Sequence, residues 1–193
     1  MFGHILGFFC VSVLLVCFVA FSVASWRHFD RVSRSRGNQF VRVLTLAGTA
    51  VLVWLVLSDW PPVAWQSAAS ILLGILSLCI FAAAIRSAPS GELHVAFTGS
   101  GPDRLVTTGI YRHVRNPLYT SYLAYWAGWI PASGMHPASV FLFAFFAAVY
   151  FAAVRGEEQF LARTFGDQYT AFKSRTGRFL PKFRSTRPTV PQA

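Results

Sequence analysis

The residues best suited to chemistry lie in the C-terminal half of the chain, in three groups: residues 105–119, the Glu157-Glu158 pair, and Arg175 with Arg178. In the first group Pro117 disfavours a helical conformation of Asn116. We therefore expect a helix to begin near Leu118, with Asn116 as its N-cap. The first-turn amides and the positive end of such a helix attract carboxylates and other anions.

Apolar runs long enough to cross a membrane must position these groups. The chain is 54% hydrophobic, with a mean hydropathy of +0.49, yet its formal net charge is +10. A chain that is both apolar and basic is typical of a membrane protein whose cations gather at one surface. No nucleic-acid recognition motif is present, so we expect no nucleic-acid partner. The three cysteines lack CxxC spacing, and we expect no metal site.

We predict an all-α integral membrane bundle of five transmembrane helices, followed by a cytosolic amphipathic helix, in a single membrane domain of residues 1–193. A run of about 20 residues spans the ~30 Å hydrocarbon core. The first three helices occupy residues 4–85, and the shorter fourth and fifth should form a hairpin. The apolar runs are His4–Ser25, Val41–Leu57, Val63–Ile85, Leu118–Ile130 and Ala138–Val154.

The segment that follows Arg155 carries an amphipathic pattern. Its stripe recurs every three or four residues, which indicates a helix lying on the bundle or on the membrane surface. Gly177 fits the end of this helix, Arg178–Pro181 would form a return segment, and we expect residues 186–193 to be a disordered tail. The stripe consists of Glu158, Leu161, Phe165, Tyr169 and Phe172.

The charges predict the orientation of the bundle. If the N-terminus lies outside and five helices follow, all 17 Lys and Arg residues fall on one side of the membrane, and Asp59 is the only charged residue on the other. The positive-inside rule places the basic side, with the C-terminus, in the cytoplasm. The first run should be a retained helix rather than a signal peptide, because its cations follow it.

Several short segments of the C-terminal half form an ordered pattern: Leu105–Arg112, Arg115–Tyr119, Glu157-Glu158 with Leu161, Phe165–Tyr169, and Arg175–Arg178 with Pro181. In this pattern the chain resembles the isoprenylcysteine carboxyl methyltransferase family, which includes phospholipid N-methyltransferases and many bacterial members. The resemblance implies a methyltransferase that uses S-adenosylmethionine, has its core in residues 86–185, and sits in the bacterial inner membrane with its active site facing the cytoplasm.

The resemblance also implies roles for single residues. S-adenosylmethionine, which would leave as S-adenosylhomocysteine, is expected to contact Leu105, Val106, Gly109, Tyr111, Asn116, Pro117, Tyr119, Glu157 and Glu158. Substrate contacts are expected from Arg175, Arg178, Tyr122 and Trp126, and catalytic roles from Arg115, Glu158 and Arg178. The family usually has His at the position of Asn116. Asn does not titrate near neutral pH, so this position is a weak candidate for an acid or base.

The nature of the acceptor decides what else the site needs. Transfer to a carboxylate requires no base, because the acid is already ionised at pH 7, and arginine suits the binding of that acid. An amine such as phosphatidylethanolamine must lose a proton, so Glu157 or Glu158 would serve as base. Adjacent residues cannot share a helix face, so we expect only one of the two glutamates to line the site.

Because arginines outnumber the candidate bases, we favour carboxyl O-methylation of a lipophilic small molecule or lipid acid. Phospholipid N-methylation is the alternative. Two further hypotheses stay open. One is a more distant enzyme, with a sterol-reductase architecture and a nicotinamide cofactor. The other is a non-catalytic lipid-binding or scaffold protein. The expected partners are the lipophilic substrate and membrane lipids, with no obligate protein partner.

Overall fold

A computed structural model describes residues 2–29, 36–58, 62–88 and 104–182. This part of the chain contains five α-helices and a short 3-10 helix, η1. It contains no strand, only an isolated bridge between Val114 and Gly177, so the all-α prediction is confirmed for it. The expected tail at 186–193 lies outside the described residues. The elements are α1 (Phe2–Phe29), α2 (Arg36–Leu57), α3 (Ala64–Ser87), η1 (Gly109–Arg112), α4 (Pro117–Ala132) and α5 (Pro137–Arg175).

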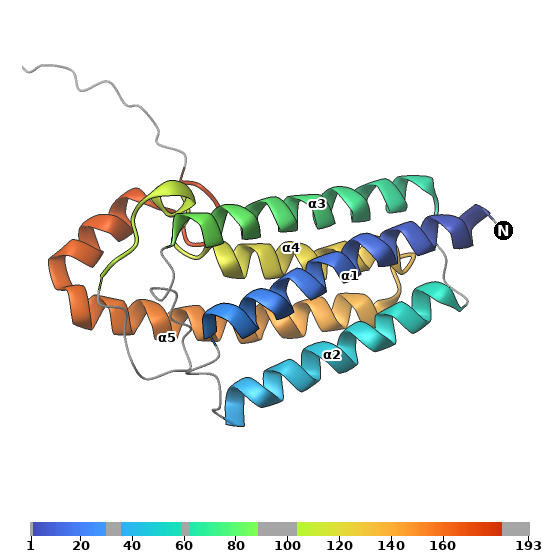
Figure 1. The fold of residues 1–193 in the computed structure, drawn as a ribbon, viewed down its shortest axis with the longest axis horizontal. Helices are drawn as coiled ribbons and strands as arrows, with labels where there is room; N and C mark the ends of the chain where they lie inside the picture. The colour runs from blue at the N-terminus through green and yellow to red at the C-terminus, as the bar shows by residue number, and fades with distance from the viewer. Residues whose placement is uncertain (1, 30–35, 59–61, 89–103, 183–193) are drawn as a thin grey trace, which may run out of the picture.

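Successive helices run in opposite directions along one long bundle (Figure 1). Four of them are long and apolar enough to cross a membrane: Gly3–Ala24, Gln39–Leu57, Ala64–Ser87 and Pro137–Arg175. Helix α4 has 16 residues. At ~1.5 Å per residue it is about 24 Å long, less than the ~30 Å hydrocarbon core. Four membrane-length helices therefore agree with the prediction, and a fifth span stays a prediction.

Helix α4 begins at Pro117, one residue before the predicted start. Proline is well tolerated there, since the first helical N–H has no partner within the helix. Asn116 occupies the N-cap position, but its side chain makes no capping hydrogen bond, so its expected role as a side-chain cap is wrong. The reason is competition, because the Asn116 amide donates to Glu158 and to the carbonyl of Arg178 instead.

The predicted hairpin of α4 and α5 is confirmed, and α4 also packs along α3. Small residues let the backbones approach: a Cβ on Gly74 would collide with Val13 of α1, and Ser77 donates across to the carbonyl of Ser121 at 2.7 Å. Aromatic rings fill the space between α4 and α5, where Trp126 stacks on Phe146 with ring centroids 3.9 Å apart. This packing holds the N-terminal end of α4 beside the middle of α5.

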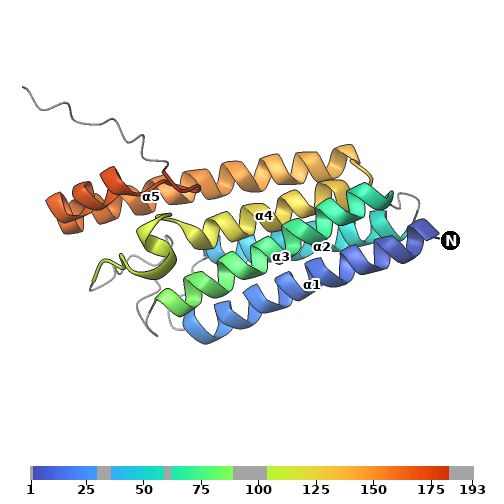
Figure 2. The ribbon, with the colours of Figure 1, turned by 90° about the horizontal axis from the view of Figure 1, so that it is seen from above.

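Helix α5 differs from the prediction of a transmembrane helix ending near Arg155 and a separate amphipathic helix. The helix continues through Arg155 and changes direction at Gly166, whose φ of 50° and ψ of −121° are not helical. No proline interrupts residues 138–175, and Glu157 to Arg163 are mostly good helix formers, so nothing stops the helix earlier. Figure 2 shows the outer part of α5 extending past the other helices and doubling back.

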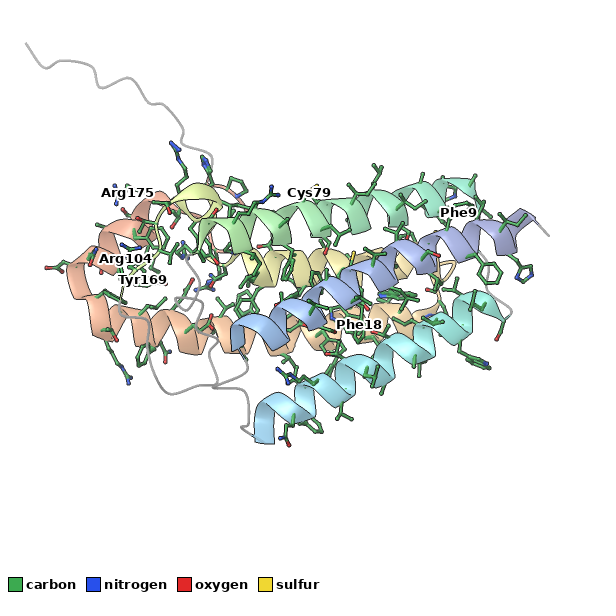
Figure 3. The ribbon with its side chains drawn as sticks, in the orientation of Figure 1. Phe9, Phe18, Cys79, Arg104, Tyr169 and Arg175 are labelled. Atoms are coloured by element: carbon green, nitrogen blue, oxygen red, sulfur yellow. The ribbon has the colours of Figure 1, made fainter. Side chains whose placement is uncertain are left out.

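An open apolar groove of about 490 Å³ separates parts of α1 and α2. Phe18, labelled in Figure 3, lies on its α1 wall. Its polar lining residue, Thr49, is paired with the hydroxyl of Tyr125 at 2.8 Å. The lining of the groove is therefore almost wholly apolar, and the polar residues of interest lie elsewhere.

Candidate active site

The segment that follows α5 returns to the start of α4. We call residues 176–182 the return strap. Its backbone pairs with that of residues 113–116: Gly177 donates to the carbonyl of His113 at 3.1 Å, and Arg115 donates back to Gly177 at 2.9 Å. Asn116 N–H also donates to the carbonyl of Arg178 at 3.2 Å. A Cβ at Gly177 would collide with the Leu180 carbonyl oxygen, so only glycine fits this close approach. The predicted return segment is thus present.

The strap and the start of α4 meet at the carboxylate of Glu158, which is 5% exposed. Arg115 Nε lies 3.0 Å from Glu158 Oε1, and Arg178 Nη2 lies 2.7 Å from Oε2. The Asn116 amide donates to Oε1 at 3.3 Å. We call Arg115, Asn116, Glu158 and Arg178 the charge cluster. Three separate stretches of sequence therefore converge on one carboxylate.

The two arginines of the charge cluster differ in what else they contact. Arg115 is almost wholly buried, and its Nη1 donates to the carbonyls of Thr176 and Lys173. The Arg178 side chain is 30% exposed and lies over the Phe151 ring, 5.2 Å from its centroid. Arg115 is therefore held by backbone carbonyls as well as by Glu158, whereas Arg178 combines its ion pair with access from outside.

The environment of Glu158 keeps its carboxyl group ionised. Burial acts to raise its pKa, but hydrogen bonds from Arg178 and Arg115 and their charges outweigh burial, so the net pKa lies below the ordinary value. A carboxylate held in this way is a poor proton acceptor at neutral pH.

Glu157 points to a different partner. Its Oε1 accepts a hydrogen bond from the Tyr119 hydroxyl at 3.2 Å. Tyr111, in η1, is also near: burial and the Glu157 charge raise the pKa of its phenol well above the ordinary value, so it stays protonated. The Tyr119 ring contacts the rings of Tyr122 and Tyr150. Both glutamate side chains therefore reach residues 111–119, although they leave α5 in different directions.

Tyr169 lies beside the charge cluster and was not predicted as a site residue. It is 1% exposed, and its hydroxyl makes no hydrogen bond of acceptable geometry within the described residues. Burial raises the pKa of this phenol to about 12, the Glu158 charge adds to the shift, and the charges of Arg115 and Arg178 oppose it. Figure 3 shows Tyr169 at the end of the bundle away from the N-terminus. Its place in an apolar helical stripe predicted packing alone.

The predicted cofactor residues before α4 line the same end of the bundle. Leu105 is buried against Tyr169 and Phe172, and Val106 is half-buried. Gly109 has a φ of 57°, and a Cβ there would collide with the Ser87 side chain. The Ser87 hydroxyl accepts from the N–H of Ile110 at 3.2 Å, which anchors η1 on the end of α3. Pro117, at the start of α4, is buried.

Three predicted substrate residues lie outside the charge cluster. Arg175 is exposed, and its Nε donates to Ala171 of its own helix at 3.2 Å. Trp126 is buried in the core, where its indole N–H donates to the Tyr150 hydroxyl at 3.2 Å. Tyr122 packs between Phe21 and Tyr150, with ring centroids 4.9 and 5.7 Å away. Of the four residues expected to bind substrate, only Arg178 belongs to the charge cluster.

Comparisons with known proteins cover most of these residues. A sequence model of the family described as "Phospholipid methyltransferase" matches residues 65–168, more than half of the chain. Methanethiol S-methyltransferase 1 of Bradyrhizobium diazoefficiens is 32% identical to this chain over 94 residues, which are 48% of this chain and 31% of that protein. The chain thus spans about a third of the length of this relative. The family match includes both glutamates and ends before the return strap.

Proposed function

This chain belongs to the phospholipid methyltransferase family, and on that premise we propose that it transfers a methyl group from S-adenosylmethionine to an acceptor that loses a proton in the reaction. The observation that carries the proposal is the pairing of Arg115 and Arg178 with one carboxylate, Glu158. The family resemblance and the membrane-length helices support a methyltransferase that works at a membrane.

The residues at this end of the bundle fit S-adenosylmethionine. The cofactor carries an ammonium group, a carboxylate and a nucleoside, and it supplies an electrophilic methyl group on a sulfonium. The charge cluster and its neighbours supply two carboxylates, a partly exposed guanidinium and an unpartnered buried hydroxyl, that of Tyr169. Leu105, Val106 and Gly109 would hold the nucleoside end, and Tyr111, Asn116, Pro117 and Tyr119 would surround the reacting end.

The pairing in the charge cluster favours an acceptor other than an acid. A carboxylate acceptor needs a free cation to bind it, and the sequence offers several arginines for that purpose. In the fold, Arg115 is buried and Arg175 lies on an exposed helix face. Arg178 uses Nε and Nη2 on Glu158, and its remaining nitrogen, Nη1, would be taken by the carboxylate of the cofactor rather than by that of an acceptor. Carboxyl O-methylation of a lipophilic acid therefore becomes the alternative rather than the first choice.

Glu157 is the residue best suited to accept the proton. Two guanidinium groups hold Glu158 ionised. The Tyr119 hydroxyl donates a hydrogen bond to Glu157 Oε1 at 3.2 Å and so orients that carboxylate. A carboxylate oriented by a phenol can take a proton from a thiol or an ammonium group at Oε1 or Oε2 as the nucleophile attacks. Tyr119 would orient that carboxylate, and the Tyr111 phenol would stay protonated beside it.

Two classes of acceptor meet this description. The family is described as methylating phospholipids, and the relative from Bradyrhizobium is named for methanethiol. A lipid amine and a thiol both lose a proton when they are methylated, and free thiols have a pKa of about 8.5. We therefore propose an acceptor with a thiol or amine group and an apolar body that partitions into the membrane.

The acceptor class is tested with the purified protein, a labelled methyl donor and three acceptors: ethanethiol, phosphatidylethanolamine and a fatty acid. We expect label in a thioether or N-methyl product, which survives base treatment. Methanol released by base from the fatty-acid sample alone would favour the O-methylation alternative. No transfer together with no binding of S-adenosylhomocysteine would favour a lipid-binding or scaffold protein.

The same assay tests the role of Glu157. Glu157→Gln should lower transfer to the accepted thiol or amine by about 10²-fold or more, because general-base catalysis contributes on this scale. Binding of S-adenosylhomocysteine, measured by calorimetry, should stay unchanged. Equal loss of binding and transfer would instead mean that Glu157 holds the ammonium group of the cofactor.

We also propose the orientation that the charges predict. The start of α4, which adjoins the charge cluster, lies at the end of the bundle opposite the start of α1 (Figure 1). That end would face the cytoplasm of a bacterium, the N-terminus would lie outside, and α4 would complete a fifth span by thinning the membrane or by sharing its depth with η1.

A further inference from the structure

The hydroxyl of Tyr169 is an unmet hydrogen-bond donor inside the protein. Tyr169 is 1% exposed, and its hydroxyl has no hydrogen-bond partner within the described residues. Leaving such a group unpaired is costly, and most buried hydroxyls have a partner. The neighbouring Arg115 cannot satisfy the O–H, because a guanidinium only donates. The missing partner is therefore an acceptor.

The charges around Tyr169 indicate the sign of that acceptor. Two guanidinium groups and one ionised carboxylate leave the charge cluster with one net positive charge. Arg178 uses Nε and Nη2 on Glu158, and its Nη1 has no hydrogen bond to any residue that the structure describes. Tyr169 thus offers its O–H and Arg178 offers the N–H groups of Nη1, beside an excess of positive charge.

A carboxylate matches this arrangement. It carries one negative charge and two oxygens, so one oxygen can accept from the phenol and the other from the guanidinium. It would bring the local charge to zero without disturbing the Glu158 ion pairs. We propose that Tyr169 and Arg178 form a carboxylate subsite that binds the amino-acid end of the methyl donor; this inference rests on the proposed function.

The subsite is tested by comparing two ligands that differ in the amino-acid end. S-adenosylhomocysteine carries the carboxylate, and 5′-methylthioadenosine lacks it. For Tyr169→Phe, calorimetry should show an affinity for S-adenosylhomocysteine that is roughly tenfold lower, as for the loss of one hydrogen bond to a charged group. The affinity for methylthioadenosine should stay the same. The unfolding temperature without ligand should not fall, since no hydrogen bond is lost.

Tyr125→Phe is the matched control. Tyr125 is as deeply buried, at 2% exposed, but its hydroxyl is paired with Thr49 at 2.8 Å. Its removal should lower the unfolding temperature and leave both affinities unchanged. The two tyrosine variants should therefore show opposite patterns, which separates a ligand contact from a structural one.

Four results would overturn the assignment. An unchanged affinity of Tyr169→Phe for S-adenosylhomocysteine would exclude the subsite. An equal loss for both nucleosides would mean that Tyr169 shapes the pocket without binding a carboxylate. If only glycerophosphoethanolamine, used as a third ligand, lost affinity, the subsite would take a lipid phosphate instead. Failure of the unmodified protein to bind either nucleoside would end the proposed function and this inference with it.

Discussion

Glu158 shows how a membrane protein keeps a charged residue inside. Burying one carboxylate without partners is prohibitive, yet Glu158 is 5% exposed. Arg115, Arg178 and Asn116 supply its donors, and each of them comes from a segment that α5 does not include. The two ion pairs therefore compensate the buried charge of the carboxylate, and they also attach the start of α4 and the strap to α5.

Replacing this carboxylate should destabilise the protein in a pH-dependent way. Glu158→Gln leaves two buried or half-buried guanidinium groups without their partner, and we expect a loss of about 3 kcal/mol at pH 7. The folded-state pKa of Glu158 lies below the ordinary value of 4.5. The contribution is thus complete above pH 4.5 and is lost as the pH falls through the lower folded-state pKa.

Thermal unfolding in detergent measures this effect. The difference in unfolding temperature between the parent protein and Glu158→Gln should be constant from pH 7 to about pH 5 and should shrink in more acidic buffers. A difference that persists unchanged at pH 3 would show that Glu158 stabilises the fold by packing rather than by charge.

At the scale of elements, α5 is the part that joins membrane and site. Its straight part, Pro137 to Phe165, is about 43 Å long at ~1.5 Å per residue, more than the ~30 Å of the hydrocarbon core. The excess carries both glutamates beyond the apolar stretch. Gly166 then turns the helix so that Tyr169 and Phe172 pack against Leu105. One long helix and one turn thus supply two sides of the site.

The turn at Gly166 gives a test with an internal control. A φ of 50° with a ψ of −121° is accessible almost only to glycine, so Gly166→Ala should cost on the order of 1–3 kcal/mol. Nothing lies within 4 Å of a Cβ at that position, so strain alone would be the cause. Binding of S-adenosylhomocysteine should weaken as well, because the turn positions Tyr169.

Gly156→Ala serves as the control in the same helix. Gly156 is also free of neighbours around a Cβ, but it lies in regular helix. Its replacement should be neutral or stabilise by up to about 1 kcal/mol, as alanine favours helix. Similar losses in both variants would contradict the strain at Gly166.

For the whole molecule, the bundle gathers its polar chemistry at one end. The helices alternate in direction, so the end of α3, the start of α4 and the strap lie at the end away from the start of α1 (Figures 1 and 2). With all 17 Lys and Arg residues predicted on that side, the positive-inside rule gives one orientation.

Reporter fusions check this orientation in bacterial cells. A fluorescent protein fused to the C-terminus should fold and emit light in the cytoplasm, and alkaline phosphatase at the same place should be inactive. The same two reporters fused after Ser58, in the loop between α2 and α3, should give the reverse result. Active phosphatase at the C-terminus would invert the topology.

The sequence was informative where one physical rule dominates. Apolar runs of membrane length predicted the helices, Pro117 predicted the start of α4 to within one residue, and the chemical types of Arg115, Glu158 and Arg178 marked them as candidates. The structure brings those three together, and their roles stay predictions. Their mutual pairing was not predictable, because it depends on contacts between residues 43 and 20 positions apart.

Other features depend on the fold alone. The continuation of α5 through Arg155 and the turn at Gly166 were missed, since a single glycine in a helical pattern rarely reverses a helix. Tyr169 was assigned to packing because its spacing fits an apolar stripe. Only burial without a hydrogen-bond partner distinguishes it from a core phenylalanine.

The backbone pairing of Val114 with Gly177 closes a ring of chain that contains α4 and α5. Both paired residues belong to the C-terminal half, so the contact that holds α4 and α5 together does not depend on α1 to α3. A gene divided after α3 should therefore yield two polypeptides that reassemble when they are made in the same cell. This property would allow each half to be labelled or randomised separately.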